Sequence, residues 1–155
     1  MSMRELRKSE SNPTFNDTRN DEVGLYSQLS NALVRIASLV SESSGRAVTM
    51  QDGDIHILGG IEHRGYGSHV AKPATKLEQF MHSGFLSGWG IGNAHIQRLK
   101  GIARELDGNV DATTTGSVTT MRRGASPWSL SETRSIYRFV QNIQSHIEQV
   151  YAVRK

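Results

Sequence analysis

The chain contains no cysteine, and this absence excludes disulfide bonds, thiolate metal ligands and cysteine nucleophiles. It also contains no apolar run near the roughly 20 residues that a membrane-spanning helix needs. Its opening segment, MSMRELRKSESNPTF, lacks the apolar stretch of a secretory signal. We therefore expect no membrane contact, and a location in the cytoplasm or within a particle.

Signatures of catalysis are also missing. The sequence has no G-x-S-x-G nucleophile motif, no phosphate-binding loop that ends in Gly-Lys-Ser or Gly-Lys-Thr, and no H-E-x-x-H zinc motif. The segment GWGIGNA at residues 88–94 departs from the dinucleotide-binding fingerprint, and no strand pattern precedes it. A triad assembled from distant residues leaves no local signature. The favoured expectation is a non-catalytic protein that uses no cofactor.

The composition is typical of a single domain with a modest apolar content. At 155 residues the chain is long enough to form a hydrophobic core. Hydrophobic residues make up only 36% of it, and the mean hydropathy of −0.45 is low for a globular protein. The net charge of +3 and the pI near 9.4 permit an anionic partner without requiring one.

The pattern of apolar residues predicts an α+β fold: a long N-terminal helix, a small antiparallel sheet, a helix-hairpin-helix-like pair and a long C-terminal helix. Residues 1–20 are polar and of mixed charge, and we interpret them as an N-terminal arm before a single domain over residues 21–155. An arm this polar needs a surface to lie on. We therefore expect a homo-oligomer or a larger assembly.

The first helix is predicted over residues 22–43, with Asp21 as its N-cap. Its apolar face consists of Leu25, Leu29, Leu33, Ile36, Ala37 and Val40. Asp52-Gly53 then separates two short alternating segments and predicts a two-residue hairpin. The threonine-rich segment 110–124 predicts one or two short strands that pair with this hairpin.

The C-terminal helix is predicted over residues 130–153. Ser129 and Glu132 have the spacing of a capping box at its start. Apolar residues then recur at steps of four and three: Ile136, Val140, Ile143, Ile147 and Val150. This seam is about two heptads long, below the three to four that indicate a coiled coil. Docking on the domain core is favoured, and a contact between subunits is the alternative.

The most unusual local sequence lies between Thr75 and Gly108. Thr75 and Glu78 have capping-box spacing, so a helix is predicted from Lys76. A glycine-rich hairpin follows. Asn93 is then predicted to cap a second helix, which ends at Gly108.

A glycine hairpin that leads into a helix exposes backbone N–H groups with no intrahelical acceptor, and such an end attracts phosphate. Gly90-Ile91-Gly92-Asn93-Ala94, followed by Arg98-Leu99, resembles the hairpin of the helix-hairpin-helix DNA-binding motif. The resemblance covers residues 76–107. Trp89 stands where that motif commonly has a proline or a small residue, and Ile96 stands where it often has a small one. The resemblance implies that backbone amides hold a nucleic-acid phosphate without reading bases.

The hairpin and the basic residues near it define a candidate phosphate site. Its residues are Gly90, Ile91, Gly92, Asn93, Arg98, Lys100, Arg104, Arg122 and Arg123. The cations form one patch if the threonine-rich segment folds back on the second helix, with Trp89 and Trp128 nearby in sequence. The alternative is a tight helix-helix turn, solvated charges and two tryptophans packed in the core.

Four of the six histidines lie close together in the sequence: His56, His63, His69 and His82. Their spacing matches no recognised metal motif, so we expect no metal site. His56 alternates with Ile55 and Ile57 and is expected to face solvent on a strand.

The segment SHVAKPATK at residues 68–76 is similar to the zinc-binding segment of M15-type cell-wall peptidases, where a histidine precedes a glycine, an alanine and a metal-binding aspartate. His69 and Ala74 match this pattern. Lys72 replaces the glycine, and Lys76 replaces the aspartate. The later His-x-His pair is missing from residues 110–125. The resemblance implies at most a peptidase-like fold without its active site.

Three functional hypotheses therefore stand. The leading one is a non-catalytic, nucleic-acid-associated or structural component of an assembly, which contacts the phosphate backbone through the glycine hairpin. The second is a capsid-type or other assembly protein without nucleic-acid contact. The third is a degenerate peptidase-like domain.

Overall fold

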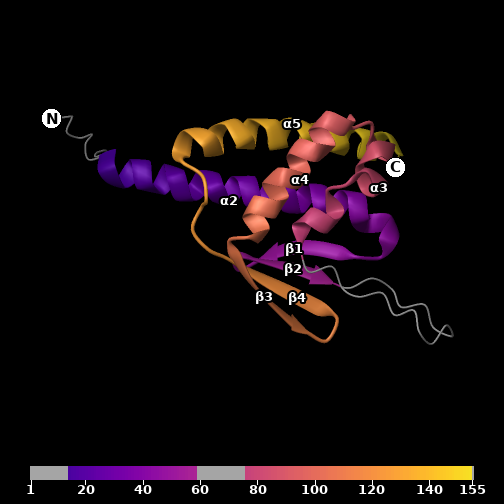
Figure 1. Ribbon diagram of the computed structural model, residues 1–155, viewed down its shortest axis with the longest axis horizontal. Coiled ribbons are helices and arrows are strands. Elements are labelled where there is room, and N and C mark those ends of the chain that lie inside the picture. The colour runs from indigo at the N-terminus through magenta and orange to yellow at the C-terminus, as the bar shows by residue number, and fades with distance from the viewer. Residues whose placement is uncertain (1–13, 59–75, 155) are drawn as a thin grey trace.

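The computed structural model describes residues 14–58 and 76–154, which form the predicted α+β fold (Figure 1). The two long helices α2 and α5 pack along each other, and the sheet packs against α2 on the side away from α5. The elements in chain order are α2 (Thr14–Ser41), η1 (Glu42–Ser44), β1 (Ala47–Gln51), β2 (Asp54–Leu58), η2 (Leu77–Phe80), α3 (Ser83–Leu86), η3 (Ser87–Trp89), α4 (Asn93–Asp107), β3 (Val110–Thr115), β4 (Val118–Arg123) and α5 (Leu130–Arg154).

Helix α2 begins at Thr14, ahead of the predicted cap at Asp21. No proline occurs between Thr14 and Ser41, and Gly24 is accommodated inside the helix, so nothing in this segment stops it. Apolar residues at helical spacing begin only at Leu25, which explains why the pattern placed the start too late.

The sheet is antiparallel, with strand order β1-β2-β4-β3. The predicted turn at Asp52-Gly53 joins β1 and β2, and the φ angles of these residues, 55° and 83°, are both positive, as a type I′ turn requires. The threonine-rich segment forms two strands, and β4 pairs with β2 as predicted. Strand β3 is left at the edge of the sheet.

The inner face of the sheet supplies part of the core, through the buried side chains of Val48, Ile55, Ile57 and Met121. The outer face is mainly polar, although the exposed side chain of Leu58 also lies on it. His56 lies on this outer face as expected, half-buried, with its Nδ1 3.2 Å from the hydroxyl of Thr120 on the neighbouring strand.

Helix α5 starts with the predicted capping box. The N–H of Ser129 donates to the carboxylate of Glu132 at 2.9 Å, and the N–H of Glu132 donates to the hydroxyl of Ser129 at 3.2 Å. Val140, Ile143 and Ile147 are buried, and the helix packs on α2 of the same chain. The apolar seam therefore docks on the domain core, as favoured.

The segment predicted as a helix from Lys76 is a single 3₁₀ turn, η2, followed by the short helix α3. Thr75, the predicted cap, lies outside the described residues. The cap comes instead from Asp107 at the end of α4, whose carboxylate accepts from the N–H groups of Leu77 and Glu78, both at 3.0 Å. Burial raises the pKa of Asp107 to about 6, and these two hydrogen bonds oppose the rise.

Candidate functional site

The glycine turn connects η3 to the start of α4. Gly90 has a φ of 80°, in the left-handed region, and its N–H donates to the carbonyl of Ser87 at 3.1 Å. Gly92 is the N-cap of α4, with φ −70° and ψ 155°, so the predicted cap, Asn93, is instead the first residue of the helix. Helix α4 therefore begins one residue earlier than predicted, because the extended backbone of the N-cap position occurs at Gly92 and not at Asn93.

The start of α4 has backbone donors without acceptors in the helix. The N–H of Ile96 is the first to bond within it, to the carbonyl of Gly92 at 3.0 Å. The amides of Asn93, Ala94 and His95 precede that bond, and no side chain of the capping residue satisfies them. All three residues are exposed, so the positive end of the helix dipole faces solvent.

Helix α5 contacts the residues just before the turn. Nε2 of His146 lies 2.9 Å from the carbonyl oxygen of Trp89, and the guanidinium of Arg154 donates to the carbonyl of Gly88. The rings of Trp89 and Tyr151 are nearly parallel, with centroids 6.3 Å apart. These contacts fix the turn against α5 through the carbonyls of Gly88 and Trp89.

A pocket of about 360 Å³ lies where the turn and the first residues of α4 meet α5. We call it the turn pocket. It is lined by Gly90, Ile91, His95, Phe139, Asn142, Ile143 and His146. It joins the exposed helix start to an aromatic ring, an amide and two imidazoles, and none of the lining residues is acidic.

The helix segments that meet at this pocket carry basic residues and no acidic ones. Residues 93–104 of α4 and residues 133–147 of α5 contain no aspartate or glutamate. Their basic residues are His95, Arg98, Lys100, Arg104, Arg134, Arg138 and His146. The guanidinium carbon of Arg98 lies 4.2 Å from the ring centroid of Phe139, which links the charge of α4 to the aromatic ring of α5.

The remaining predicted cations are placed differently. Arg104 forms an ion pair with Glu78 at 2.7 Å, and the same hydrogen bond lowers the pKa of Glu78. Lys100 is half-buried and lies near enough to lower that pKa further. Arg122 lies 3.6 Å from Asp54 across the outer face of the sheet. Arg104 and Arg122 therefore each have a carboxylate partner within the chain.

Arg123 and the turn lie at opposite ends of α4. The N–H of Gly124 donates to the carbonyl of Asn109 just beyond the end of α4, about 22 Å from its start at 1.5 Å per residue. Arg123 donates to the hydroxyl of Ser27 at 3.1 Å and lies over the ring of Tyr26. The structure thus brings Gly90, Ile91, Gly92, Asn93 and Arg98 together and places Arg122 and Arg123 elsewhere.

The two tryptophans also lie apart. Trp128 packs edge-on against Tyr26 beside Arg123, with ring centroids 6.1 Å apart. Trp89 lies at the turn, where the guanidinium of Arg154 is 4.2 Å from its ring centroid. Both tryptophan side chains are half-buried against the core.

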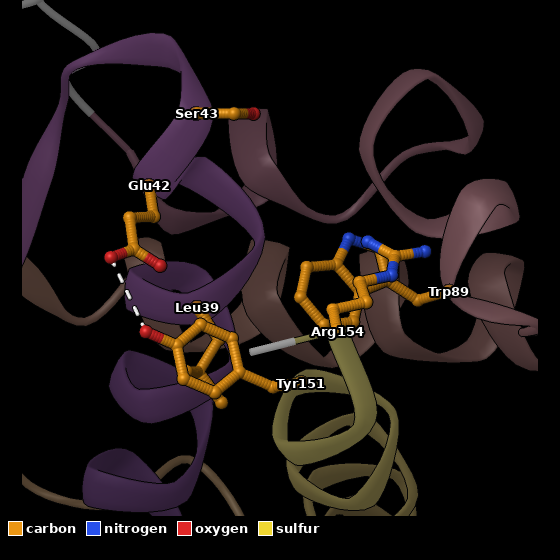
Figure 2. Close-up of a pocket in the computed structure, with 6 residues that line it drawn as sticks. All are labelled: Leu39, Glu42, Ser43, Trp89, Tyr151 and Arg154. Atoms are coloured by element: carbon orange, nitrogen blue, oxygen red, sulfur yellow. Dashed lines mark hydrogen bonds between the residues drawn. The ribbon is translucent and has the colours of Figure 1, made fainter.

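A second pocket, of about 290 Å³, lies between the end of α2, Trp89 of the turn and the end of α5 (Figure 2). It is lined by Leu39, Glu42, Ser43, Trp89, Tyr151 and Arg154. Figure 2 shows Arg154 next to the Trp89 ring, and the hydroxyl of Tyr151 donating to Glu42 at 3.3 Å. The carboxylate of Glu42 makes this pocket less suited to an anion than the turn pocket.

The residues predicted for the site from the sequence did not include four that line the turn pocket: His95, Phe139, Asn142 and His146. The spacing of Phe139, Asn142 and His146 at i, i+3 and i+7 places them on one side of α5, which was a usable signal. What the sequence did not specify was that this side of α5 meets the start of α4.

The other histidine hypotheses are only partly covered by the structure. His63 and His69, together with Lys72 and Ala74 of the peptidase-like segment, lie outside the described residues. The Nδ1 of His82 accepts from the N–H of Gly84 at 3.1 Å and caps α3. Among the described side chains, those of residues 24–58 and 76–154, no group of three or more potential ligands is placed to hold a metal ion.

No helix in the described part of the chain combines the length and apolar character needed to cross a membrane. Comparisons with protein-family models, with curated protein sequences and with solved structures found no match to this chain. The arrangement of the site is therefore the basis for any functional conclusion.

Proposed function

We propose that the protein is a non-catalytic, nucleic-acid-associated component of an assembly, and that the start of α4 binds the phosphate backbone. The observation that carries this proposal is the exposed, uncapped start of α4 beside helix segments without acidic residues. Free amides at a helix N-terminus favour an oxyanion. The cations of α4 and α5 add the long-range attraction that draws a polyanion to the surface.

The site favours backbone contact over base reading. The donors at Asn93, Ala94 and His95 are main-chain groups, whose positions do not depend on the base sequence of a ligand. A Cβ placed on Gly92 would meet no atom within 4 Å, so the space in front of these amides is open to a phosphate. We therefore expect binding that is independent of base sequence and weakens steeply with salt, because it releases counterions.

Fluorescence anisotropy with labelled oligonucleotides at several salt concentrations tests the proposal. Arg98→Ala is expected to weaken binding and to reduce the salt slope by about one unit. Gly92→Val is expected to abolish binding, since its branched side chain would occupy the approach to the amides. The matched control is Arg122→Ala, a cation paired with Asp54 beyond the far end of α4, which should leave binding unchanged. Absence of binding by the wild-type protein at low salt would refute the proposal.

The edge strand β3 supports a second candidate function, assembly without nucleic acid. Every residue from Asp111 to Thr115 is exposed, and the strand pairs one-to-one with β4 without a bulge. It has no lysine or proline, the residues that commonly protect sheet edges. An antiparallel pairing with a second copy, centred on Thr113, places Asp111 opposite Thr115 of that copy, so no like charges meet.

Sedimentation velocity of Thr113→Lys distinguishes this candidate. Two lysines would face each other in the symmetric pairing, so the variant should sediment as a smaller species than the wild type. Thr49→Lys, on the same face but on the opposite edge strand β1, is the control and should not change the mass. Identical profiles for Thr113→Lys and the wild type would rule out β3 pairing. Under either function, we expect the protein in the cytoplasm or within a particle.

A further inference from the structure

The turn pocket has features that a phosphate site alone does not need. Phosphate binding at the start of α4 requires only amides and positive charge, yet a pocket of about 360 Å³ opens directly beside them. Such a volume is at the small end of the range for ligand-binding clefts. Its lining combines the half-buried ring of Phe139 with the side chain of Asn142 and the imidazoles of His95 and His146.

We propose that the turn pocket receives one unstacked nucleobase, so that the protein binds single-stranded nucleic acid in preference to duplex. This inference rests on the proposed phosphate site and adds the base to it. The backbone amides of α4 hold a phosphate, and the base next to that phosphate enters the space between α4 and α5.

The aromatic ring of Phe139 is the principal contact for the base. The guanidinium of Arg98 lies over one face of this ring, 4.2 Å from its centroid, so a base on that side would stack on the guanidinium. The ring of His95 is a second neighbour, tilted by 49° with its centroid 5.6 Å away. Aromatic rings and stacked guanidinium groups form platforms on which any base can stack, because every base has a π face.

The polar groups at the pocket suit the edge of a base. Asn142 is exposed, and its side-chain amide has both donors and an acceptor. The imidazole of His95 is also exposed and lies at the first turn of α4, beside the amides that would hold the phosphate. The absence of acidic side chains in the lining leaves no charge that would repel an adjacent phosphate.

A duplex does not satisfy this geometry. Its bases are stacked and paired, and a base must leave the stack to enter a pocket beside the backbone, which costs unpairing energy. A single strand presents bases that are already free to turn toward the ring. The same site therefore selects the single strand, although its amides contact only the phosphate.

The test compares three ligands of equal length with the full chain: a single-stranded oligonucleotide, the corresponding duplex, and a single strand of abasic deoxyribose phosphate. The wild-type protein is expected to bind the oligonucleotide about 5- to 150-fold more tightly than the abasic strand, the range for stacking of one base. It should also bind the oligonucleotide more tightly than the duplex.

Two variants locate the effect in the pocket. Phe139→Leu removes the aromatic face, and Asn142→Ala removes the amide. Each should bring the ratio of oligonucleotide to abasic affinity closer to one. Gln141→Ala, at an exposed position of α5 that does not line the pocket, is the control and should keep the wild-type ratio. Because Asn142 and Gln141 are both exposed, neither change should affect folding.

The outcomes separate this inference from the proposed function. Equal affinity of the wild type for the abasic strand and the oligonucleotide overturns the base pocket and leaves the phosphate site standing. Equal or tighter binding of the duplex also overturns it. Absence of binding to all three ligands overturns both. A ratio that Phe139→Leu and Asn142→Ala leave intact shows that the base contacts lie elsewhere and overturns the pocket assignment.

Discussion

A Cβ atom placed on Gly90 would lie 3.2 Å from Nε2 of His146. A side chain at this position would therefore push His146 aside by a few tenths of an ångström. The same glycine has a φ of 80°, where a side chain would be strained even in open space. Two independent constraints, one from the backbone and one from packing, thus act at a single residue of the candidate site.

Gly90→Ala should destabilise the fold by about 1 to 2 kcal/mol from the left-handed backbone alone, with a further loss if His146 must move. Urea unfolding measures the effect. Gly92→Ala is the matched control, because Gly92 has an extended backbone and open space around it. We expect a much smaller change there. Equal losses at the two positions would contradict the packing account.

Asp107 should make stability depend on pH. Its pKa rises from 3.8 in the unfolded chain to about 6 in the fold, chiefly through burial. The folded state therefore holds this proton more tightly. The stability that it contributes is fully present below pH 3.8 and is lost as the pH rises through 6, by up to roughly 3 kcal/mol in total.

The variant Asp107→Asn does not titrate at this position, so the difference in unfolding free energy between wild type and variant isolates the effect. This difference should shift in favour of the variant as the pH rises from 4.5 to 7. Chemical denaturation across this interval measures it, and the other carboxylates cancel in the comparison. A difference that stays constant with pH would show that the Asp107 carboxyl titrates alike in the folded and unfolded states.

Ser129→Ala should cost about 1 kcal/mol of stability, because the N–H of Glu132 loses its acceptor at the start of α5. Thermal unfolding followed by circular dichroism detects the change. Ser131→Ala, exposed and two residues further on, should be nearly neutral. If both variants melt with the wild type, the capping box contributes nothing measurable.

Truncation tests the expectation that the N-terminal arm supports assembly. Because α2 begins at Thr14, removal of residues 1–13 leaves the helix whole, whereas removal of residues 1–20 also deletes its first two turns. The shorter truncation should lower the oligomer mass or assembly yield without loss of helical signal. An unchanged sedimentation profile would argue against a role for the arm.

Local patterns were sufficient where a signal and its structure lie within a few residues. The positive φ angles at Asp52-Gly53 are those that this dipeptide favours, and the capping box at Ser129 and Glu132 needs only one turn of helix. The start of α2 was placed too late because its first residues carry no apolar periodicity. Short-range geometry was thus predictable, and boundaries without such a signal were not.

The sequence by itself determined the α+β class, the hairpin, the strand character of the threonine-rich segment and the presence of a glycine turn before α4. Only the tertiary structure decided that Asp107 caps η2, that Arg104 and Arg122 have carboxylate partners, and that Phe139 and His146 meet the turn. The reason is physical: backbone propensity and hydrogen-bond spacing act over a few residues, whereas these contacts join residues 26 to 68 positions apart. Such contacts depend on the packing of α4, α5 and the sheet around α2.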